Sequence, residues 1–430
     1  GEHGYTSIIS GKWHLGMEES QSPRARGFEK SFSLIPGGAS HFADMRPAYA
    51  PRPDIKAFYR EDGRKLDKLP DTFEYSSQYY VDYMLDALRE REDADQPFFA
   101  YLSFTAPHWP LQAPDAAINK FKGSYDDGYD ALRSQRLAGG IRAGVLPAGS
   151  KESPAPAAYK PWSDLNDVER QRQAREMEVY AAMISELDRH TGRLIEHLRE
   201  TGELDNTVIV FMADNGAEGH DLNETWPADL FPDIRKTIDE SHDFSFDQIG
   251  RPGSYSLYGH GWGWAGSPAF NLYKAFPTEG GTRAAAFVSY TQWQNAPDIY
   301  SGLISVKDVM PTFLELASID HQTKEGYEPV TGQSQLTVLA DREAVSNADE
   351  RVLATELFGK RAVRKGDWKI VHMPQPYGGD RWRLYNLKDD LAESIDLSEQ
   401  YPEKFNEMLA LWDTYQQENS VILPDWVSGY

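Results

Sequence analysis

A long amphipathic segment that leads directly into a short apolar one sets the strongest limit on the fold. Between Val168 and Thr201, apolar side chains recur at steps of three, four and seven, which predicts one helix with a single apolar face. These side chains are Met177, Tyr180, Ile184, Leu187, Leu194 and Leu198. The run from Val208 to Ala213 is continuously apolar, as in strands buried on both faces of a parallel sheet. A helix that feeds such a strand is half of a βαβ unit, so we expect an α/β fold with a central, mostly parallel sheet flanked by helices.

Other segments extend this architecture. The patterns predict strands at Tyr5–Ser10, Phe98–Phe104, Ala284–Tyr290, Val352–Leu357, Lys360–Arg364, Trp368–Met373 and Trp382–Leu387, and helices at Thr72–Arg91, Val306–Ala317 and Pro402–Gln417. Strands in succession followed by one helix indicate a smaller antiparallel α+β unit. We therefore expect a first domain over residues 1–350, with insertions near 115–167 and 217–272, and a C-terminal domain over residues 351–430.

The composition excludes several functions. The 430 residues include no Cys, which rules out disulfides, thiolate metal sites and a Cys nucleophile within this sequence. The 67 Asp and Glu outnumber the 44 Lys and Arg, and the net charge of −23 argues against a nucleic-acid partner. The longest apolar run, Val208 to Ala213, is far shorter than the roughly 20 residues that cross a bilayer, so no membrane partner is expected.

Chemically capable side chains follow three of the predicted strands: Lys12 and His14, then His108, then Asp214 and Asn215. Each alone is more often a solvated or structural residue. Ligands of parallel sheets bind beyond the carboxyl ends of the strands, however, so their joint placement indicates a site. The oxygens of Asp214 and Asn215 suit Ca²⁺ or Mg²⁺, and histidines exchange protons near neutral pH. Two lysines, Lys12 and Lys274, would neutralise a multiply charged oxyanion, which fits transfer of a sulfuryl or phosphoryl group.

Six segments surround these residues or follow them along the chain: Gly4–Gly16 (GYTSIISGKWHLG), Ala106–Leu111, Ala213–Gly216, Lys274 with Glu279–Arg283, Gly366–Lys369 and Leu384–Leu387. These motifs resemble those of the type I sulfatases of the alkaline phosphatase superfamily. In order and spacing they are most similar to the bacterial arylsulfatase type, and the resemblance runs along nearly the whole sequence.

The resemblance implies a role for each matched residue. Lys12 and Lys274 would bind sulfate oxygens, and His14 would hold the hydrated nucleophile. His108 would contact the bridging ester oxygen and, with Lys274, help the leaving group depart. For the metal, it implies that Asp214 and Asn215 ligate one Ca²⁺, with Mg²⁺ less favoured.

The nucleophile that the resemblance implies is missing from this sequence. It is a formylglycine made from Cys or Ser two positions before a Pro, yet none of the 26 Pro has Ser or Cys at that position. No Asp precedes Asp44, so the family's paired Asp ligands also lack counterparts. We expect the sequence to begin after the first strand and the nucleophile of such a domain, and the chain alone to be inactive.

Two alternatives stay open. Phosphonate and phosphate ester hydrolases of the same superfamily usually carry His after the distal Asp, where this chain has Asn215. A non-catalytic, truncated homologue would explain the missing nucleophile. The oligomeric state is not indicated by the sequence.

For the substrate, the acidic balance favours a small aryl or alkyl sulfate over an anionic polymer. Trp226, Trp262 and Trp264 would suit an aromatic leaving group. Outside the motifs, His41 lies on a turn that could approach the site, and Arg283 is expected to be structural. The remaining histidines without motif support are expected to be structural or at the surface: His3, His220, His242, His260 and His372.

Overall fold

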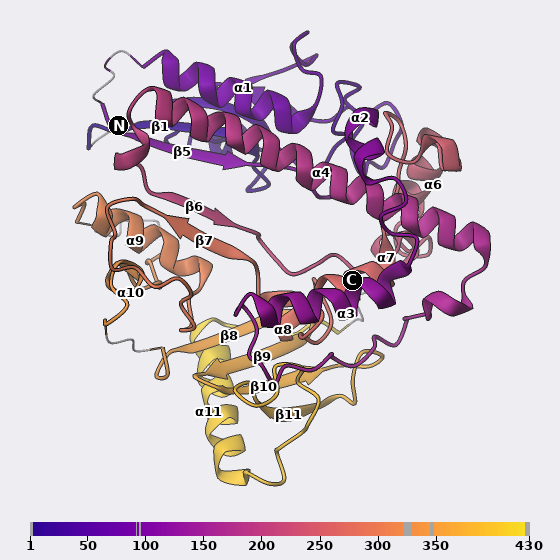
Figure 1. The fold of residues 1–430 in the computed structure, drawn as a ribbon, viewed down its shortest axis with the longest axis vertical. Coiled ribbons are helices and arrows are strands. Elements are labelled where there is room, and N and C mark those ends of the chain that lie inside the picture. Colours follow the sequence, from indigo (N-terminus) through magenta and orange to yellow (C-terminus); the bar gives the residue numbers. More distant parts are fainter. Residues whose placement is uncertain (1–2, 92, 94–95, 321–327, 345–347, 426–430) are drawn as a thin grey trace. The chain divides into compact units, whose positions relative to one another are not determined.

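The structure is a computed structural model that describes residues 3–91, 93, 96–320, 328–344 and 348–425 (Figure 1). The chain forms two compact units, each made of several segments. Unit 1 comprises Gly1–Asp130, Lys160–Leu204 and His220–Trp262, and unit 2 comprises Ala131–Tyr159, Asp205–Gly219 and Gly263–Tyr430.

Unit 1 is built on a five-stranded sheet in the order β4-β3-β2-β1-β5. Its strands are β1 (Thr6–Lys12), β2 (Lys30–Leu34), β3 (Tyr59–Glu61), β4 (Arg64–Lys65) and β5 (Phe98–Ser103). The central strand β1 runs parallel to both β2 and β5, whereas β3 and β4 add an antiparallel hairpin. The parallel centre of the sheet confirms the expected α/β class.

Two helices of unit 1 lie side by side, α1 (Ser76–Arg89) and α4 (Asp167–Glu200) (Figure 1). Residues of α1 pack on the sheet, where Met84 and Leu88 form a core with Ile8 of β1. Asn166 begins α4 by accepting a hydrogen bond from the Glu169 backbone N–H, in a capping box.

The bounds of α4 differ by one residue from the prediction, but the predicted apolar face was partly wrong. Met177 and Leu198 are buried, whereas Ile184 is 40% exposed. The buried face instead includes three carboxylates, at Glu176, Glu178 and Glu186. Each of these carboxylates forms an ion pair with an arginine of the same helix. The prediction had placed such charged residues on the solvent side of the helix.

The remaining helices lie in the predicted insertions and in the second half of the chain. They are α2 (Asp115–Ile118), α3 (Gly128–Arg142), α5 (Leu222–Thr225), α6 (Pro232–Ser241), α7 (Gly259–Gly266), α8 (Glu279–Thr282), α9 (Val309–Leu316) and α10 (Leu336–Ala340). Short 3-10 turns occur at Glu19–Gln21, Asn119–Phe121, Trp162–Asp164, Leu204–Asn206, Phe246–Gln248 and Val306–Asp308.

Unit 2 contains the strand that follows α4. This strand, β6 (Ile209–Met212), pairs with β7 (Ala286–Ser289) in a two-stranded sheet, and the pairing is antiparallel. The parallel pairing expected for this apolar run was therefore wrong for the described residues. The length and apolar character of β6 are compatible with parallel or antiparallel pairing, because the sequence of one strand does not show which strand pairs with it.

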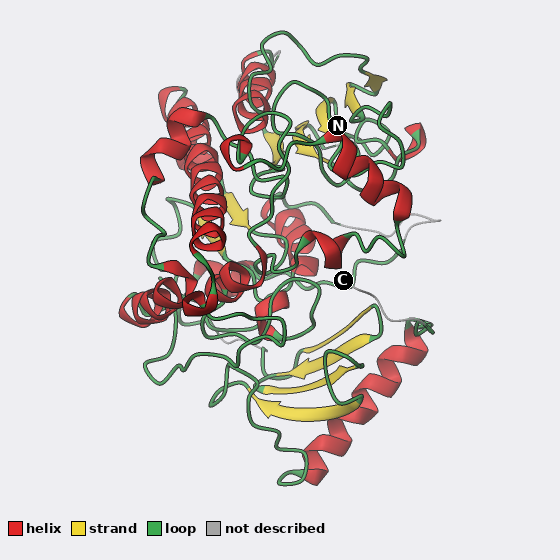
Figure 2. Ribbon diagram, turned by 90° about the vertical axis from the view of Figure 1, so that its right-hand side faces the viewer, coloured by secondary structure: helices red, strands yellow, loops and turns green. Residues whose placement is uncertain are grey.

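The C-terminal part of unit 2 is a four-stranded antiparallel sheet in the order β11-β10-β9-β8, with the helix α11 packed along it (Figure 2). Its elements are β8 (Val352–Leu357), β9 (Lys360–Lys365), β10 (Trp368–Met373), β11 (Arg381–Asn386) and α11 (Pro402–Glu418). Val363, Ile370, Leu384, Met408 and Trp412 form its core. The predicted antiparallel sheet and closing helix are confirmed, whereas their status as a separate domain over 351–430 stays a prediction; residues 426–430 lie outside the described part.

Among the described residues, none of the helices combines the length and the apolar character that crossing a membrane requires.

Candidate functional site

Lys12 is the last residue of β1, at the carboxyl end of a parallel strand. The preceding Gly11 has φ +126°, and a Cβ there would lie 1.9 Å from the carbonyl oxygen of Ser103 on β5. The Ser103 hydroxyl donates to the carbonyl of Lys12 over 2.7 Å. The close approach of β1 and β5 therefore needs a glycine at 11 and fixes the backbone from which the Lys12 side chain projects.

His14 lies two residues beyond β1, and its backbone is hydrogen-bonded to the residue that follows β2. Its N–H donates to the carbonyl of Ile35 over 3.0 Å, and its φ of 54° is in the left-handed region. The imidazole lies against Gly37, where a Cβ would be 2.7 Å from the ring and 2.7 Å from the hydroxyl of Tyr49. Tyr49 accepts a hydrogen bond from the Gly37 N–H over 3.1 Å. A side chain at 37 would thus displace His14 or Tyr49.

His108 follows β5 in a turn in which its N–H donates to the carbonyl of Thr105. Its Nδ1 lies 2.7 Å from the carbonyl oxygen of Trp109, and its ring packs on the Trp109 indole at 4.4 Å. Because a carbonyl only accepts, Nδ1 carries the hydrogen in this contact. The His108 ring also lies in van der Waals contact range of a Cβ at Gly38.

Unit 1 therefore brings His14 and His108 to one stretch of backbone, Gly37–Gly38, with Lys12 two residues from His14. Sequence reasoning missed this glycine pair and Tyr49 as parts of the site. The adjacent glycines were visible in the sequence, but only the structure shows which rings they admit.

His41, three residues beyond Gly38, also reaches the His108 segment. It is fully buried, and its Nε2 lies 3.0 Å from the backbone carbonyl of His108. Its Nδ1 lies 2.8 Å from the hydroxyl of Ser76. Burial lowers the pKa of His41 to about 4, against the opposing effect of the hydrogen bond to His108. The turn does approach the candidate site, and the His41 ring is neutral near pH 7.

In unit 2, the loop after β6 carries Asp214 and Asn215. The Gly216 N–H donates to the carbonyl of Gly281 over 3.0 Å, and a Cβ at Gly216 would lie 1.7 Å from the carbonyl oxygen of Gly280. Asp214 is exposed and Asn215 is half-buried. The loop is thus held by backbone contacts to α8, whose glycines belong to the Glu279–Arg283 motif.

Lys274 lies beside the same loop. Its N–H donates to the carbonyl of Ala217 over 2.8 Å, and its Nζ lies 3.2 Å from Oε2 of Glu218. Unit 2 therefore brings Asp214, Asn215 and Lys274 to one loop. Sequence reasoning missed Glu218, because a single acid in an acidic stretch carries no signal of its partner.

A buried ion cluster supports α8 from the C-terminal sheet. Glu279 contacts Lys369 at 2.9 Å and also pairs with Arg283 and Arg364. Glu393 accepts from the Glu279 N–H over 2.8 Å and pairs with Lys369 at 2.9 Å. Burial raises the pKa of Glu279, but the charges of Lys369, Arg283 and Arg364 outweigh it and hold that pKa below its usual range. Arg283 takes part in this cluster through its ion pair with Glu279, and its structural role stays a prediction.

The side chains of Asp214 and Asn215 are chemically suited to the Ca²⁺ that the family resemblance implies, although they supply only some of its ligands. The Asn215 amide nitrogen donates to the carbonyl of Gly216 over 2.7 Å, which leaves the Oδ1 oxygen to act as a ligand beside the Asp214 carboxylate. Both are the hard oxygens that Ca²⁺ takes, six to eight at a time. Two ligands from this loop would hold a Ca²⁺ ion only together with further ligands.

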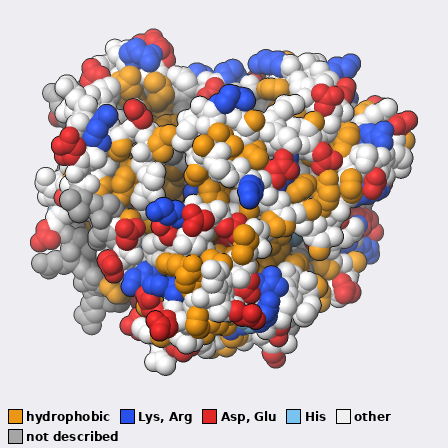
Figure 3. Space-filling model, turned by 60° about the horizontal axis from the view of Figure 1, so that its bottom comes forward, with side chains coloured by type: hydrophobic (Ala, Val, Ile, Leu, Met, Phe, Trp, Pro, Cys, Tyr) orange, Lys and Arg blue, Asp and Glu red, His pale blue; other side chains and the backbone are white. Residues whose placement is uncertain are grey.

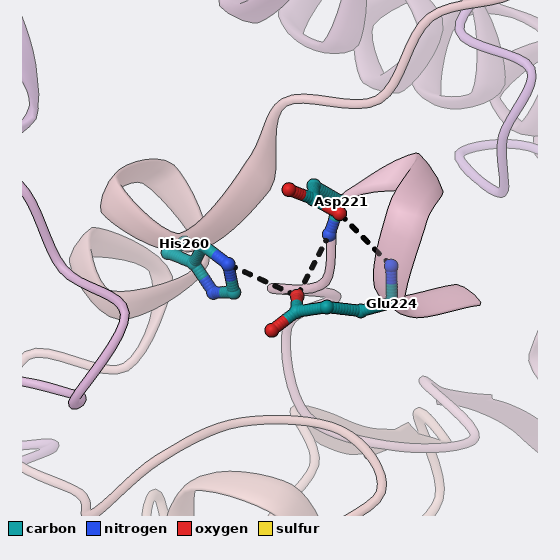
Figure 4. A group of neighbouring side chains, drawn as sticks. All are labelled: Asp221, Glu224 and His260. Atoms are coloured by element: carbon teal, nitrogen blue, oxygen red, sulfur yellow. Dashed lines mark hydrogen bonds and ion pairs between the residues drawn. The ribbon is translucent and has the colours of Figure 1, made fainter. Parts of the chain in front are cut away.

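A second group of possible metal ligands, Asp221, Glu224 and His260, lies in unit 1 (Figure 4). Asp221 accepts from the Glu224 N–H over 3.0 Å, and Glu224 accepts from the Asp221 N–H over 3.2 Å, in a capping box of α5. Glu224 also lies 3.0 Å from Nε2 of His260. These contacts account for the group as a cap that ties α7 to α5, in agreement with a structural His260.

The three tryptophans considered for an aromatic leaving group differ in their surroundings. Trp262 is 1% exposed and donates to the carbonyl of Gln173, and Trp264 is 8% exposed with the Arg133 guanidinium 3.5 Å over its ring. Both are packing residues, so this role was wrong for them. Trp226 is half-buried and lies 5.0 Å from the ring of Tyr49, which contacts Gly37 next to His14.

Comparison with known proteins gives a consistent result. Residues 1–319 match the family model described as Sulfatase. An uncharacterized sulfatase of Schizosaccharomyces pombe is 37% identical, over 98% of this chain and 76% of that protein. The arylsulfatase of Klebsiella aerogenes is 35% identical, over 83% of this chain and 74% of that enzyme.

Solved structures share the fold at lower identity. The structure of Ps i-CgsB in complex with k-i-k-neocarrahexaose has a TM-score of 0.63 at 20% identity, over 99% of this chain and 74% of that one. BT4656 in complex with D-glucosamine-2-N,6-O-disulfate has a TM-score of 0.56 at 17% identity, over 97% of this chain and 80% of that one.

Proposed function

Because this chain belongs to the sulfatase family, we propose that Lys12, His14, His108 and Lys274 act in the hydrolysis of small aryl or alkyl sulfate esters. The family makes the protein a sulfuric ester hydrolase by class. The observation that supports the assignment of residues is the backbone stretch Gly37–Gly38, which has no room for a side chain at 37 beside His14 and lies near the ring of His108.

In unit 1, His108 is suited to the leaving-group side of the reaction. With Nδ1–H donating to the carbonyl of Trp109, a proton taken up by the neutral ring goes to Nε2. A hydrogen bond from Nε2 to the bridging oxygen would stabilise the negative charge that develops there as the S–O bond breaks. His14 would orient the nucleophile, and Lys12, at the end of β1, would bind a sulfate oxygen.

In unit 2, Lys274 would bind a second sulfate oxygen. Its ion pair with Glu218 keeps the ammonium in place while no anion is bound. Asp214 and Asn215 would hold Ca²⁺, with Mg²⁺ less suitable, because Mg²⁺ demands stricter geometry and keeps more of its waters. When bound, the ion supplies positive charge that stabilises anionic oxygens near it.

The nucleophile that we propose is a formylglycine hydrate, which supplies covalent catalysis. No residue of the printed sequence fits its motif, so we propose that these residues by themselves bind sulfate esters without turning them over. Asn215 favours this reading over a phosphonate ester hydrolase, since an amide oxygen suits Ca²⁺ better than a transition metal.

The acidic balance of the chain favours a small substrate over an anionic polymer. On the face drawn in Figure 3, acidic and basic side chains of the described residues are interspersed. We propose a small sulfate ester whose charge is met by Lys12 and Lys274.

Calorimetric titration of the purified chain tests the binding function. With Ca²⁺ present, sulfate and 4-nitrophenyl sulfate should bind, binding should weaken at least about tenfold in Lys274→Met, and no 4-nitrophenol should be released. Sequencing of the DNA upstream of the Gly1 codon adds a second test, since an in-frame Cys/Ser-x-Pro-x-Arg would support the formylglycine. Preferential binding of a phosphonate monoester, or equal binding by Lys274→Met, would refute the proposal.

A further inference from the structure

The turn over residues 37–41 contacts both site histidines and ends in a third. Gly37 lies against the ring of His14 and Gly38 against that of His108, while the His41 ring contacts the backbone carbonyl of His108. We propose that His41 is a positioning residue, which holds the His108 segment by donating from Nε2 to the His108 carbonyl. This inference rests on the proposed function, in which His108 faces the ester oxygen.

The contacts of His41 leave little freedom to its ring. The side chain is fully buried, and the two ring nitrogens lie 3.0 Å from the His108 carbonyl oxygen and 2.8 Å from the Ser76 hydroxyl. Its backbone carbonyl accepts from the Ser76 N–H over 2.8 Å. A ring held at both nitrogens and at its own backbone can fix the position of the group it contacts.

The chemistry of the partners assigns the tautomer. The His108 carbonyl can only accept, so Nε2 of His41 must carry a hydrogen. The Ser76 hydroxyl can donate, so Nδ1 of the neutral ring accepts from it. Since burial lowers the pKa of His41 to about 4, this neutral Nε2–H form persists at the pH at which hydrolases commonly work.

A second contact anchors the same segment four residues further on. The Oε1 of Gln112 accepts from the His41 N–H over 2.9 Å and from the Ser40 hydroxyl over 3.0 Å. Its Nε2 donates to the carbonyl of Ser254 over 2.9 Å, so Gln112 is itself fixed. Residues 40–41 therefore bind the backbone of His108 and the side chain of Gln112. These contacts restrict the position of the backbone that carries the His108 ring.

This matters because a misplacement of about 1 Å in a group that contacts the leaving oxygen can cost on the order of 10²-fold in rate. A histidine whose only role was to fill the core would not need a hydrogen bond to the backbone of a site residue such as His108. The difference between the two roles lies at one atom, Nε2, and two substitutions separate them.

The test compares His41→Gln with His41→Asn. The Gln amide nitrogen can reach the place of Nε2 and keep the bond to His108, whereas the Asn amide reaches only the place of Nδ1, near Ser76. Each variant loses one ring contact. In the 430-residue chain, the ¹⁵N resonances of the His108 ring should shift in His41→Asn and stay close to wild type in His41→Gln.

In enzyme that carries the formylglycine, kcat for aryl sulfates should fall on the order of 10²-fold in His41→Asn with KM within about twofold, and recover in His41→Gln. The loss should grow as the leaving alcohol becomes more basic, because the His108 hydrogen bond then matters more. Equal losses in both variants, with an unchanged dependence on the leaving group, would show a structural role and overturn the inference.

The wild-type chain offers a measurement that needs no variant. The ¹⁵N shifts of the His41 ring should report the Nε2–H tautomer from about pH 5 to pH 8. An Nδ1–H tautomer, or a titration near pH 6.5, would overturn the inference even if His41→Asn failed to fold. Failure of the proposed function would show separately, as absence of sulfate binding in a chain whose His41 and His108 resonances still behave as expected.

Discussion

The Nζ of Lys274 lies 3.2 Å from Oε2 of Glu218, and the two side chains are only 20% and 16% exposed. The positive charge proposed to bind sulfate is thus already balanced by a carboxylate. An arriving anion must share Lys274 with Glu218, whose negative charge opposes it at short range. The pair holds Lys274 in position and lowers the affinity of the loop for anions.

Removal of this carboxylate should strengthen anion binding. In Glu218→Gln, we expect the Kd for inorganic sulfate to fall about fivefold at low salt, as Coulomb's law gives for one charge several ångströms away at an intermediate dielectric constant. Calorimetric titration would measure it. The control is Glu407→Gln, which removes a negative charge from an ion pair of α11 in the same unit. Weaker binding in Glu218→Gln than in the control would mean that Glu218 supports the sulfate site.

A methyl group at residue 37 should disturb His14 more than it disturbs folding. In Gly37→Ala the Cβ would lie 2.7 Å from the His14 ring, so the ring must move. We expect altered ¹⁵N shifts of His14 and, in enzyme with the formylglycine, a kcat lower on the order of 10²-fold. At Gly149 a Cβ would meet no atom within 4 Å, so Gly149→Ala should match wild type. Unshifted His14 resonances in Gly37→Ala would contradict the packing described.

The buried His41 should make stability depend on pH. Its pKa is about 4 when folded, against about 6.5 when unfolded, so the unfolded chain binds more protons between these values. The contribution to the unfolding free energy is complete above about pH 6.5 and is lost as the pH falls through 4, by about 3 kcal/mol. Urea unfolding at several pH values should show this loss in wild type in excess of His41→Gln, which cannot titrate. Parallel pH curves for the two proteins would count against a neutral, buried His41.

Loss of Lys369 should be costly. In Lys369→Met, Glu279 and Glu393 would lie buried beside each other without the ammonium between them, and breaking such a pair costs about 3–5 kcal/mol. Lys365→Met is the matched control, because Lys365 is 28% exposed and water screens its ion pairs with Glu350 and Glu407. Denaturant unfolding followed by tryptophan fluorescence would compare them, and similar losses would show that the buried cluster contributes no more than a surface pair.

Regular local patterns made much of the fold predictable. The long helix α4 and the strands β8 and β10 were located within one residue, because period and turn residues act within a short stretch of sequence. The strand β2 was missed, since its alternate residues Ser31 and Ser33 are buried serines that look like loop residues. The helix α3 was missed because Gly139 and Gly140 interrupt its pattern.

Some residues of the candidate site could also be found from local sequence patterns, whereas others could not. Motifs located Lys12, His14, His108, Asp214, Asn215 and Lys274, whose roles stay proposals. Glu218 and Tyr49 were not assigned, because Glu218 matters through its ion pair with Lys274 and Tyr49 through its contact with Gly37. For His41 the sequence suggested only that its turn could approach the site, and the contact with His108 appears only in the fold.

The ion cluster around Lys369 also bears on how this protein can vary over evolutionary time. Glu279, Glu393 and Lys369 depend on one another for charge balance in a place that water does not reach. A descendant that changes one of them alone passes through an unstable intermediate, whereas a joint change that also accommodates Arg283 and Arg364, the other partners of Glu279, does not. In related sequences these three positions should therefore change jointly or not at all.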